Sequence, residues 1–405
     1  MDRSIGDLFR AYGEDYIRTY KPPLNHIKLI RAIRVCRTPA LGGKRIVCKG
    51  CGDTKHIFLS CGQTQCPLCQ NRKRTLWQQK LSDKFLNVPY VHTVFTIPHE
   101  LNPLARNNKK TIYNITMRAA WQTIKNLCAT PKYVGGLPGM VSVLHTFGSD
   151  MKYHIHVHTL ITFGGIDKQG QWVWPKNKKR LAPYRKICKE YRKTFIKLLR
   201  KDIAKGLLKK VGDMESLIEV IEKKRWNVRN EYPTADTEIL EGYLARYINR
   251  IAISKSRLEF VKTAQNINDE VNITYKDYRR QVKGEAAPIA IKKVNPLVAI
   301  NQFLSHVLPQ YFQKSRHYGI HAPNTYRRIK DKIPEKLKRN SNSIKVLFAI
   351  LNHMNGIKEH LCDVCQNDTF EILPLKADQT WIFEFITVPS YRAPPGKYRS
   401  EPLFS

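Results

Sequence analysis

The chain has 405 residues, enough for two or three domains, and 42% of them are hydrophobic, enough for well-packed cores. It carries 70 lysines and arginines against 33 acidic residues, and this formal net charge of +37 far exceeds what solubility needs and indicates a polyanionic partner, most often nucleic acid. No window of 18 apolar residues is present, which excludes a transmembrane helix and leads us to expect no membrane partner.

Ten cysteines narrow the possible functions further. The first residues lack the apolar run of a signal peptide, so we expect the protein to lie in the cytoplasm. Disulfides are rare in that compartment, and cysteines in C-x-x-C pairs are therefore expected to bind metal.

A zinc module is predicted near the N-terminus. Residues 5–35 have apolar residues at helical spacing around a Pro-Pro break, which predicts one or two amphipathic helices. Two C-x-x-C pairs follow, with 14 residues between them: Cys48 and Cys51, then Cys66 and Cys69. Four cysteines at this spacing predict one structural zinc site with every position filled, although Cys61 or His56, between the pairs, could replace a ligand.

A basic run follows the second pair: Arg72, Lys73 and Arg74. A rigid zinc module with an attached basic run could dock on DNA, whereas a basic run alone is also typical of a solvated surface. We predict DNA contact for these three residues.

The next part of the chain has the pattern of a sheet with a covering helix: strand Val91–Ile97, helix 101–128, and strands Gly139–Phe147 and Tyr153–Thr162. Polar and apolar residues alternate in the last strand, so His154, His156 and His158 share one face. Burying three imidazoles is costly unless a metal ligates them. The alternative is a set of partly exposed, hydrogen-bonded histidines.

The third ligand of such a site can come from either of two strands. A short turn at Gly148 joins the last two strands, so we expect them to be antiparallel neighbours. This pairing places His145 beside His156 and His158, and it makes a three-histidine metal site geometrically natural. His154, on the same strand as the pair, is the competing ligand.

Residues 181–225 predict a long helical region with a strongly basic face. The segment from Tyr184 to Lys210 contains eleven lysines and arginines against two acidic residues, with apolar residues at helical spacing between them. This density favours contact with phosphates, while a solvated surface helix remains the alternative.

A later predicted helix carries two tyrosines four residues apart, Tyr243 and Tyr247, which share one face. Arg246 and Arg250 share a neighbouring face. Core packing is the commoner role of such a tyrosine pair, but here a histidine site and a cationic surface accompany it.

The rest of the chain gives weaker signals. Strands are predicted at Arg257–Val261 and Val271–Tyr275, and a helix at Asn301–Leu308. Cys362 and Cys365 form a lone C-x-x-C pair with no second pair nearby, so its role stays open.

One chemistry accounts for the histidines, the tyrosines and the positive charge together. A phenol is a poor nucleophile near neutral pH, since its pKa is about 10. It can attack a phosphodiester when a metal, here Mg²⁺ or Mn²⁺, neutralises charge on the phosphate oxygens. The attack displaces a 3′ hydroxyl and leaves a 5′-phosphotyrosine that can be rejoined without ATP, which agrees with the absence of a Walker-type loop.

The residues also resemble a known family. His156-Val157-His158 is similar to the histidine–hydrophobic–histidine motif of the HUH nucleases, and His145 matches the third ligand of many relaxases. Together with the Cys48…Cys69 module and the segments Tyr243–Leu258 and Phe303–Gly319, the chain resembles the two-tyrosine rolling-circle transposases of the bacterial insertion-sequence family called ninety-one, over most of residues 35–320.

The resemblance implies a fold and a function. It implies an α+β fold with a ferredoxin-like HUH core and a central antiparallel sheet. It implies a bacterial, nucleoid-associated enzyme that cleaves and rejoins single-stranded DNA at hairpin-bearing element ends and inserts it into target DNA, with Tyr243 and Tyr247 as nucleophiles. The domains expected are residues 1–84 (helices and zinc module), 85–290 (nuclease domain with the basic helical insertion and the tyrosine helix) and 291–405 (C-terminal accessory region).

Two alternatives remain. A rolling-circle replication initiator or relaxase would use the same site to nick an origin, and the N-terminal zinc module favours the transposase over it. A zinc-dependent DNA-binding regulator without catalysis would instead keep both tyrosines buried and bind no exchangeable metal at the histidines.

Overall fold

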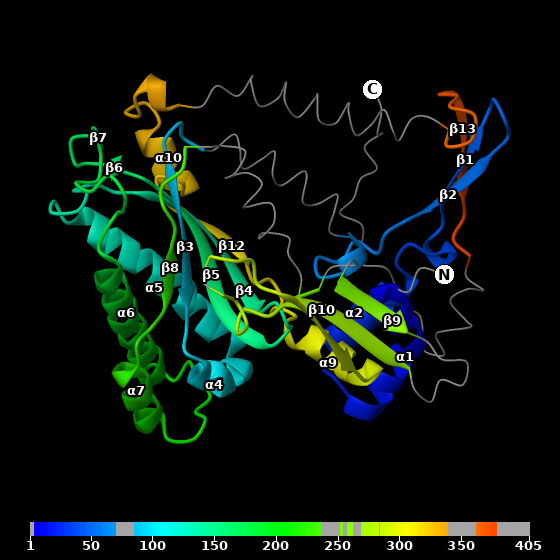
Figure 1. The fold of residues 1–405 in the computed structure, drawn as a ribbon, viewed down its shortest axis with the longest axis horizontal. Helices are drawn as coiled ribbons and strands as arrows, with labels where there is room; N and C mark the ends of the chain where they lie inside the picture. The colour runs from blue at the N-terminus through cyan, green and yellow to red at the C-terminus, as the bar shows by residue number, and fades with distance from the viewer. Residues whose placement is uncertain are drawn as a thin grey trace. The chain divides into compact units, whose positions relative to one another are not determined.

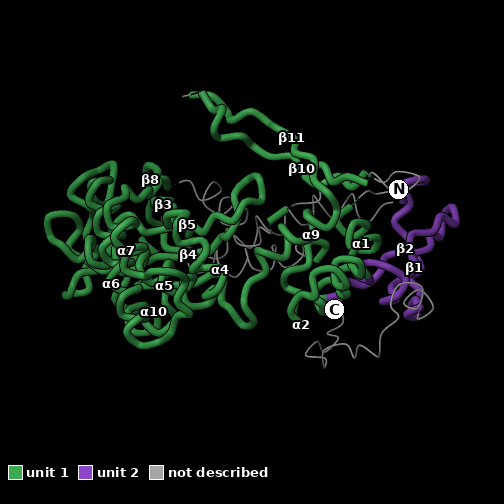
Figure 2. The backbone as a smooth tube through the Cα atoms, turned by 90° about the horizontal axis from the view of Figure 1, so that it is seen from below, with its two compact units in different colours: residues 1–34, 62–360 green, residues 35–61, 361–405 purple. Residues whose placement is uncertain are grey.

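The computed structural model describes residues 4–69, 85–235, 252–253, 257–261, 269–282, 284–338 and 362–378 (Figure 1). The chain forms two compact units, each built from separate segments: residues 1–34 with 62–360, and residues 35–61 with 361–405 (Figure 2). None of the helices in these described ranges is both long and apolar enough to span a membrane.

The larger unit contains most of the helices and strands. In chain order they are α1 (Ile5–Tyr20), α2 (Leu24–Val35), β3 (Tyr90–Thr96), α4 (Asn102–Asn107), α5 (Lys109–Ala129), β4 (Gly139–Phe147), β5 (Tyr153–Thr162), β6 (Gly165–Ile166), β7 (Trp172–Val173), α6 (Tyr184–Ala204), α7 (Met214–Lys223), β8 (Val228–Asn230), β9 (Leu258–Val261), β10 (Glu270–Lys276), β11 (Ile289–Val294), α9 (Pro296–Ser305), β12 (Ser315–Gly319) and α10 (Pro323–Ile329).

A five-stranded sheet forms the centre of this unit, in the order β12-β4-β5-β3-β8, and every neighbouring pair is antiparallel. Helix α5 lies in the connection from β3 to β4, which places β5 between these two strands. Helix α6 lies in the connection from β5 to β8, which places β3 between them (Figure 1). The sheet is therefore built from two interleaved strand–helix–strand crossovers.

Apolar side chains on both faces of this sheet are buried, which fixes its strand register. On one face, Phe95, Leu144 and Val157 pack in a core with the apolar sides of α5 and α6. On the other face, Val143 and Leu160 belong to a second buried cluster. A slip of one residue would exchange the two faces of each strand, so the position of every polar side chain in it is strongly specified.

The sequence-based predictions for this sheet are confirmed where the pattern is strongest. Strands β4 and β5 have the predicted bounds and pair antiparallel. The predicted helix 101–128 is two helices, because Asn108 leaves helical geometry (φ −133°) and its side-chain amide donates to the carbonyl of Lys209 at 2.9 Å. The helix predicted at Asn301–Leu308 starts earlier, since Asn295 caps it and proline occupies its first turn.

A second part of the larger unit combines helices α1 and α9 with a three-stranded sheet of order β11-β10-β9. Phe9 of α1 meets Phe303 of α9 edge to face, with ring centroids 5.5 Å apart. The Tyr12 hydroxyl donates a hydrogen bond to Asp269 at 2.8 Å. Apolar and polar contacts thus hold the N-terminal helix to residues more than 250 positions later.

The smaller unit is a three-stranded antiparallel sheet of order β13-β1-β2, made by β1 (Gly43–Cys48), β2 (Thr54–Phe58) and β13 (Phe370–Leu375). Cys48 is the only fully buried side chain in these three strands. The region predicted as a C-terminal accessory domain, residues 291–405, contributes to both units. Its residues up to 360 belong to the larger unit, and residues 361–405 belong to the smaller one.

Candidate metal centres

Three histidines meet at the middle of the five-stranded sheet. His145 on β4 lies directly opposite His156 on β5, and His158 follows two residues later on the same face. Their metal-binding nitrogen atoms all lie within 4.8 Å of one another. Their side chains are 2% (His145), 9% (His156) and 8% (His158) exposed, so water solvates these imidazoles poorly.

A hydrogen bond to the backbone fixes the orientation and tautomer of the His156 ring. Its Nδ1–H donates to the backbone carbonyl of His154 at 3.0 Å. The tautomer that makes this bond carries its lone pair on Nε2. Metal-ligating histidines commonly donate their other N–H to a backbone carbonyl in this way, because the bond fixes the ring orientation.

A second chain of hydrogen bonds orients His158. The Glu231 carboxylate lies 3.2 Å from Nδ1 of His92, and Nε2 of His92 lies 3.2 Å from Nδ1 of His158. Burial lowers the pKa of His92, which favours its neutral form. With Nδ1–H of His92 donating to Glu231, Nε2 of His92 accepts from Nδ1–H of His158. In this arrangement Nε2 is the nitrogen through which His158 would hold a metal. Sequence reasoning missed both His92 and Glu231.

The candidate ligand group contains His145 and not His154, although the exposed His154 ring lies 5.0 Å from that of His156 between centroids. Three neutral imidazoles suit a divalent transition metal and leave coordination positions for other ligands. Such an open site is typical of a catalytic metal, whereas a structural zinc site has all positions filled.

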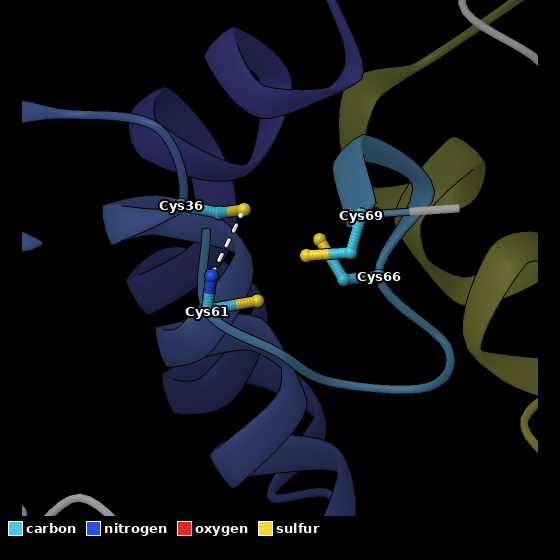
Figure 3. Close-up of side chains that lie close together, drawn as sticks. All are labelled: Cys36, Cys61, Cys66 and Cys69. Carbon is cyan, nitrogen blue, oxygen red and sulfur yellow. Dashed lines mark hydrogen bonds between the residues drawn. The ribbon is translucent and has the colours of Figure 1, made fainter. Parts of the chain in front are cut away.

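The cysteines group differently from the prediction. Cys66 and Cys69 lie with Cys36 and Cys61, and their four sulfur atoms are within 4.8 Å of one another (Figure 3). The Cys61 N–H donates to the Cys36 sulfur at 3.4 Å. Sequence spacing suggested Cys61 as a substitute ligand but did not indicate Cys36, because Cys36 is not part of a C-x-x-C pair. This group has the composition of a structural zinc site.

The other predicted pair has a distant partner. Cys48 and Cys51 lie with Cys362 and Cys365, again with four sulfur atoms within 4.8 Å. The predicted single site of Cys48, Cys51, Cys66 and Cys69 is therefore not a group that the structure forms. The reason is strand pairing: β13 hydrogen-bonds to β1 and carries the late C-x-x-C pair to the early one.

Several predicted residues lie outside the part of the chain that the structure describes. They are the tyrosines Tyr243 and Tyr247, the arginines Arg246 and Arg250, and the basic run Arg72, Lys73 and Arg74. The predicted basic helix is described: α6 buries Tyr191, Phe195 and Leu199 in the core, while its lysines and arginines occupy the other side. That arrangement is amphipathic, as predicted.

Comparisons with known proteins agree on one family. Residues 139–328 match the family model described as "Putative transposase", and residues 8–97 match the one described as "Transposase zinc-binding domain". The chain is 32% identical over 338 residues to "Putative transposase y4qJ" of Sinorhizobium fredii, covering 80% of this chain and 82% of that protein. It is 25% identical over 326 residues to "Transposase for insertion sequence element IS801" of Pseudomonas savastanoi pv. phaseolicola, covering 77% and 74%. No solved structure matches significantly.

Proposed function

Because the chain belongs to the transposases of the insertion-sequence ninety-one family, we propose that it cleaves and rejoins single-stranded DNA at element ends through 5′-phosphotyrosine intermediates. The observation that carries this proposal is the group of three buried histidines on two paired strands. Transposases act on DNA, and the net charge of +37 suits that partner.

We assign a ferredoxin-like HUH core to the five-stranded sheet. The strand order β4-β5-β3-β8, with α5 and α6 in the two crossovers, supports this assignment because it is the order of a β-α-β-β-α-β fold. Strand β12 extends the sheet beside β4. The histidines then lie on the adjacent strands β4 and β5, on the face opposite α5 and α6.

The residues of the histidine site would hold Mg²⁺ or Mn²⁺ in function through Nε2 of His156 and His158 and a nitrogen of His145. A bound cation would neutralise charge on the non-bridging oxygens of the scissile phosphate. The protein's own contribution is to hold the rings of His156 and His158 in fixed orientations, through the His154 carbonyl and the His92–Glu231 pair respectively.

Tyr243 and Tyr247 are the proposed nucleophiles. The phenolic oxygen forms a bond to phosphorus while the bond from phosphorus to the 3′ oxygen breaks. The phenolic proton is lost and the 3′ oxygen gains one, so the products are a 5′-phosphotyrosine and a free 3′ hydroxyl. Rejoining reverses these changes with a new 3′ hydroxyl, and two tyrosines allow one to hold an end while the other cleaves.

DNA binding is assigned to two groups of cationic residues, one near the proposed nucleophiles and one near the zinc-binding cysteines. Arg246 and Arg250 lie next to the proposed nucleophiles in sequence, and Arg72, Lys73 and Arg74 follow the zinc-binding cysteines. We propose that these residues contact the phosphates of single-stranded ends and hairpins. Zinc at the cysteine group of Figure 3 would be structural.

The proposal is tested by which end of the DNA strand stays in a covalent protein adduct and by whether that adduct needs a metal. Single-stranded oligonucleotides of the element ends, labelled at the 3′ end, should give a labelled protein adduct that survives denaturing gels in the presence of Mn²⁺. Chelation with EDTA should remove the adduct, and added Mn²⁺ or Mg²⁺ should restore it. Label carried only from the 5′ end would contradict the 5′-phosphotyrosine, and absence of any adduct would favour the non-catalytic regulator.

Joining of the cleaved strand to target DNA is the step that distinguishes a transposase from other enzymes that use the same chemistry. A replication initiator or relaxase would form the same adduct. The match of residues 8–97 to a transposase zinc-binding domain favours a transposase that joins the end to target DNA.

Replacing Glu231 by alanine is expected to weaken Mn²⁺ binding by roughly tenfold, because His92 loses its acceptor and His158 loses its fixed tautomer. The measurement is a Mn²⁺ titration that follows the free ion by electron paramagnetic resonance. Glu219→Ala is the matched control, since that exposed carboxylate pairs with Lys223 on α7. Equal affinities in the two variants would exclude the orienting role of Glu231.

A further inference from the structure

The smaller unit holds a cysteine group that joins two ends of the sequence. The sulfur atoms of Cys48 and Cys365 lie 3.5 Å apart, and those of Cys51 and Cys362 lie 3.6 Å apart. More than 300 residues separate the partners in each contact. Two of the four, Cys362 and Cys365, lie beyond both segments that match known transposase families.

The two C-x-x-C turns have the same backbone hydrogen bonds. The N–H of Cys48 donates to the carbonyl of Asp53 at 2.8 Å, and that of Cys362 donates to Asn367 at 2.8 Å, five residues on in each case. The carbonyls of the same two cysteines each accept an N–H from four residues on, at 2.9 Å. Two segments without local sequence similarity beyond C-x-x-C thus adopt one turn shape.

The backbone angles of these turns agree. The residue four positions after the first cysteine has a positive φ in both: 75° at Gly52 and 57° at Gln366. Glycine adopts this geometry freely, whereas a glutamine there is uncommon and is held by its surroundings. The turns also pack together, since a Cβ at Gly50 would lie 2.8 Å from the side chain of Asn367. Glycine at this position lets the second turn approach the first.

The sulfur positions fit a metal better than disulfides. None of these four cysteines forms a disulfide, and 3.5 Å is far longer than the roughly 2.05 Å of an S–S bond. Four sulfurs at about 2.3 Å from one tetrahedral Zn²⁺ are about 3.8 Å apart, close to the separations seen here. Hydrogen bonds between thiols would explain the two separate sulfur–sulfur contacts, but they would not explain why all four sulfur atoms lie close together.

Stability gives a physical reason for a metal in this unit. Its strands bury almost no apolar side chains, so the hydrophobic effect stabilises the sheet little. Small units of this kind need a disulfide or a metal to fold. Closing a loop of some 300 residues also costs chain entropy, which ligand bonds from both turns to one ion would offset.

We propose that Cys48, Cys51, Cys362 and Cys365 bind a second structural Zn²⁺, which fastens the C-terminal strand β13 to the N-terminal hairpin β1–β2. The register of β13 on β1 runs for six residue pairs, from Gly43–Leu375 to Cys48–Phe370. It places the two turns at the same end of the sheet. An ion pair between Lys55 and Asp363, at 2.7 Å, adds a contact between the same segments.

Zinc content of the full-length chain tests the inference. After exhaustive dialysis against excess Mn²⁺, which competes with zinc for the open histidine site, elemental analysis should find two Zn²⁺ per wild-type chain, one for each four-cysteine group. The variant Cys362→Ser with Cys365→Ser should retain one. Cys365→His should retain two, because zinc accepts three cysteines and one histidine. Cys188→Ala, which removes a buried cysteine of α6 outside both groups, is the matched control and should also retain two.

Other zinc counts would overturn the inference. A single four-cysteine site made by Cys48, Cys51, Cys66 and Cys69 gives one Zn²⁺ in the wild type and the same amount in the Cys362/Cys365 variant. Two Zn²⁺ retained by that variant would equally exclude its cysteines as ligands. Zinc analysis does not involve DNA cleavage, so the result is independent of the proposed nuclease activity.

Thiol labelling of the unmodified protein gives a second test that needs no variant. Cys51 and Cys365 are exposed, so as free thiols they would react at once with N-ethylmaleimide. Bound to zinc, both should stay unlabelled until a strong chelator is added, and mass spectrometry of the peptides should show them labelled together. Immediate labelling of both in zinc-replete protein would overturn the inference.

Discussion

Changing Tyr243 and Tyr247 together to phenylalanine is expected to reduce the covalent protein–DNA adduct below detection. The substitution removes only the two phenolic oxygens, and the proposed reaction forms its new bond to phosphorus at one of them. The proposed phosphate contacts are made by lysines and arginines, which the substitution leaves in place, so binding of the same oligonucleotide should persist. The adduct is measured on denaturing gels with 3′-labelled single-stranded ends and Mn²⁺.

The single variants and a distant phenol serve as controls. Tyr278→Phe removes an exposed hydroxyl in the loop after β10 and should leave the adduct unchanged. If the two tyrosines act in sequence, one single variant should still attack the first end while failing to complete transfer. An adduct that persists in the double variant would place the nucleophile elsewhere and refute the assignment of both tyrosines.

The centre of the fold could be predicted because its signals are local. Alternation in Tyr153–Thr162 fixes which side chains share a face, and a short turn fixes the antiparallel pairing with Gly139–Phe147. These two facts together place His145 opposite His156. Their role as metal ligands stays a proposal, whereas their proximity is confirmed.

His92 and Glu231, which orient His158, could not be predicted, because no local signal in the sequence places them there. His92 lies in a predicted strand, but only the order β5-β3-β8 brings it beside His158 and brings Glu231 beside His92. Sheet order depends on packing across the whole unit, and sequence periodicity does not report it. One signal was available: His92 is the one imidazole in a strand of apolar, aromatic and threonine residues, and a buried imidazole needs hydrogen-bond partners.

The grouping of the cysteines also depends on strand pairing that the sequence does not report. C-x-x-C spacing establishes that two sulfurs can share an ion, but it does not say which second pair completes the site. Nearness in sequence favoured Cys66 and Cys69 as partners of Cys48 and Cys51. Pairing of β13 with β1 brings Cys362 and Cys365 there instead, across most of the chain.

Replacing His156 by alanine is expected to lower the rate of cleavage by about a thousandfold, since loss of a metal worth about 4 kcal/mol to the transition state has that effect. The affinity for the single-stranded end should change by less than about threefold at constant salt, because the proposed phosphate contacts are made by lysines and arginines and not by this histidine. Single-turnover cleavage with Mn²⁺ and fluorescence anisotropy with EDTA measure the two quantities separately.

His154→Ala is a closely matched control for this variant. It removes the same side chain from the same strand, two residues away, but His154 is exposed and lies outside the group of three histidines. Its backbone carbonyl, which accepts the N–H of His156, is unaffected by the substitution. Cleavage should therefore remain close to wild type in His154→Ala and be lost in His156→Ala. Equal loss in both variants, or loss of DNA binding with cleavage in His156→Ala alone, would indicate that these histidines support the sheet rather than hold a catalytic metal.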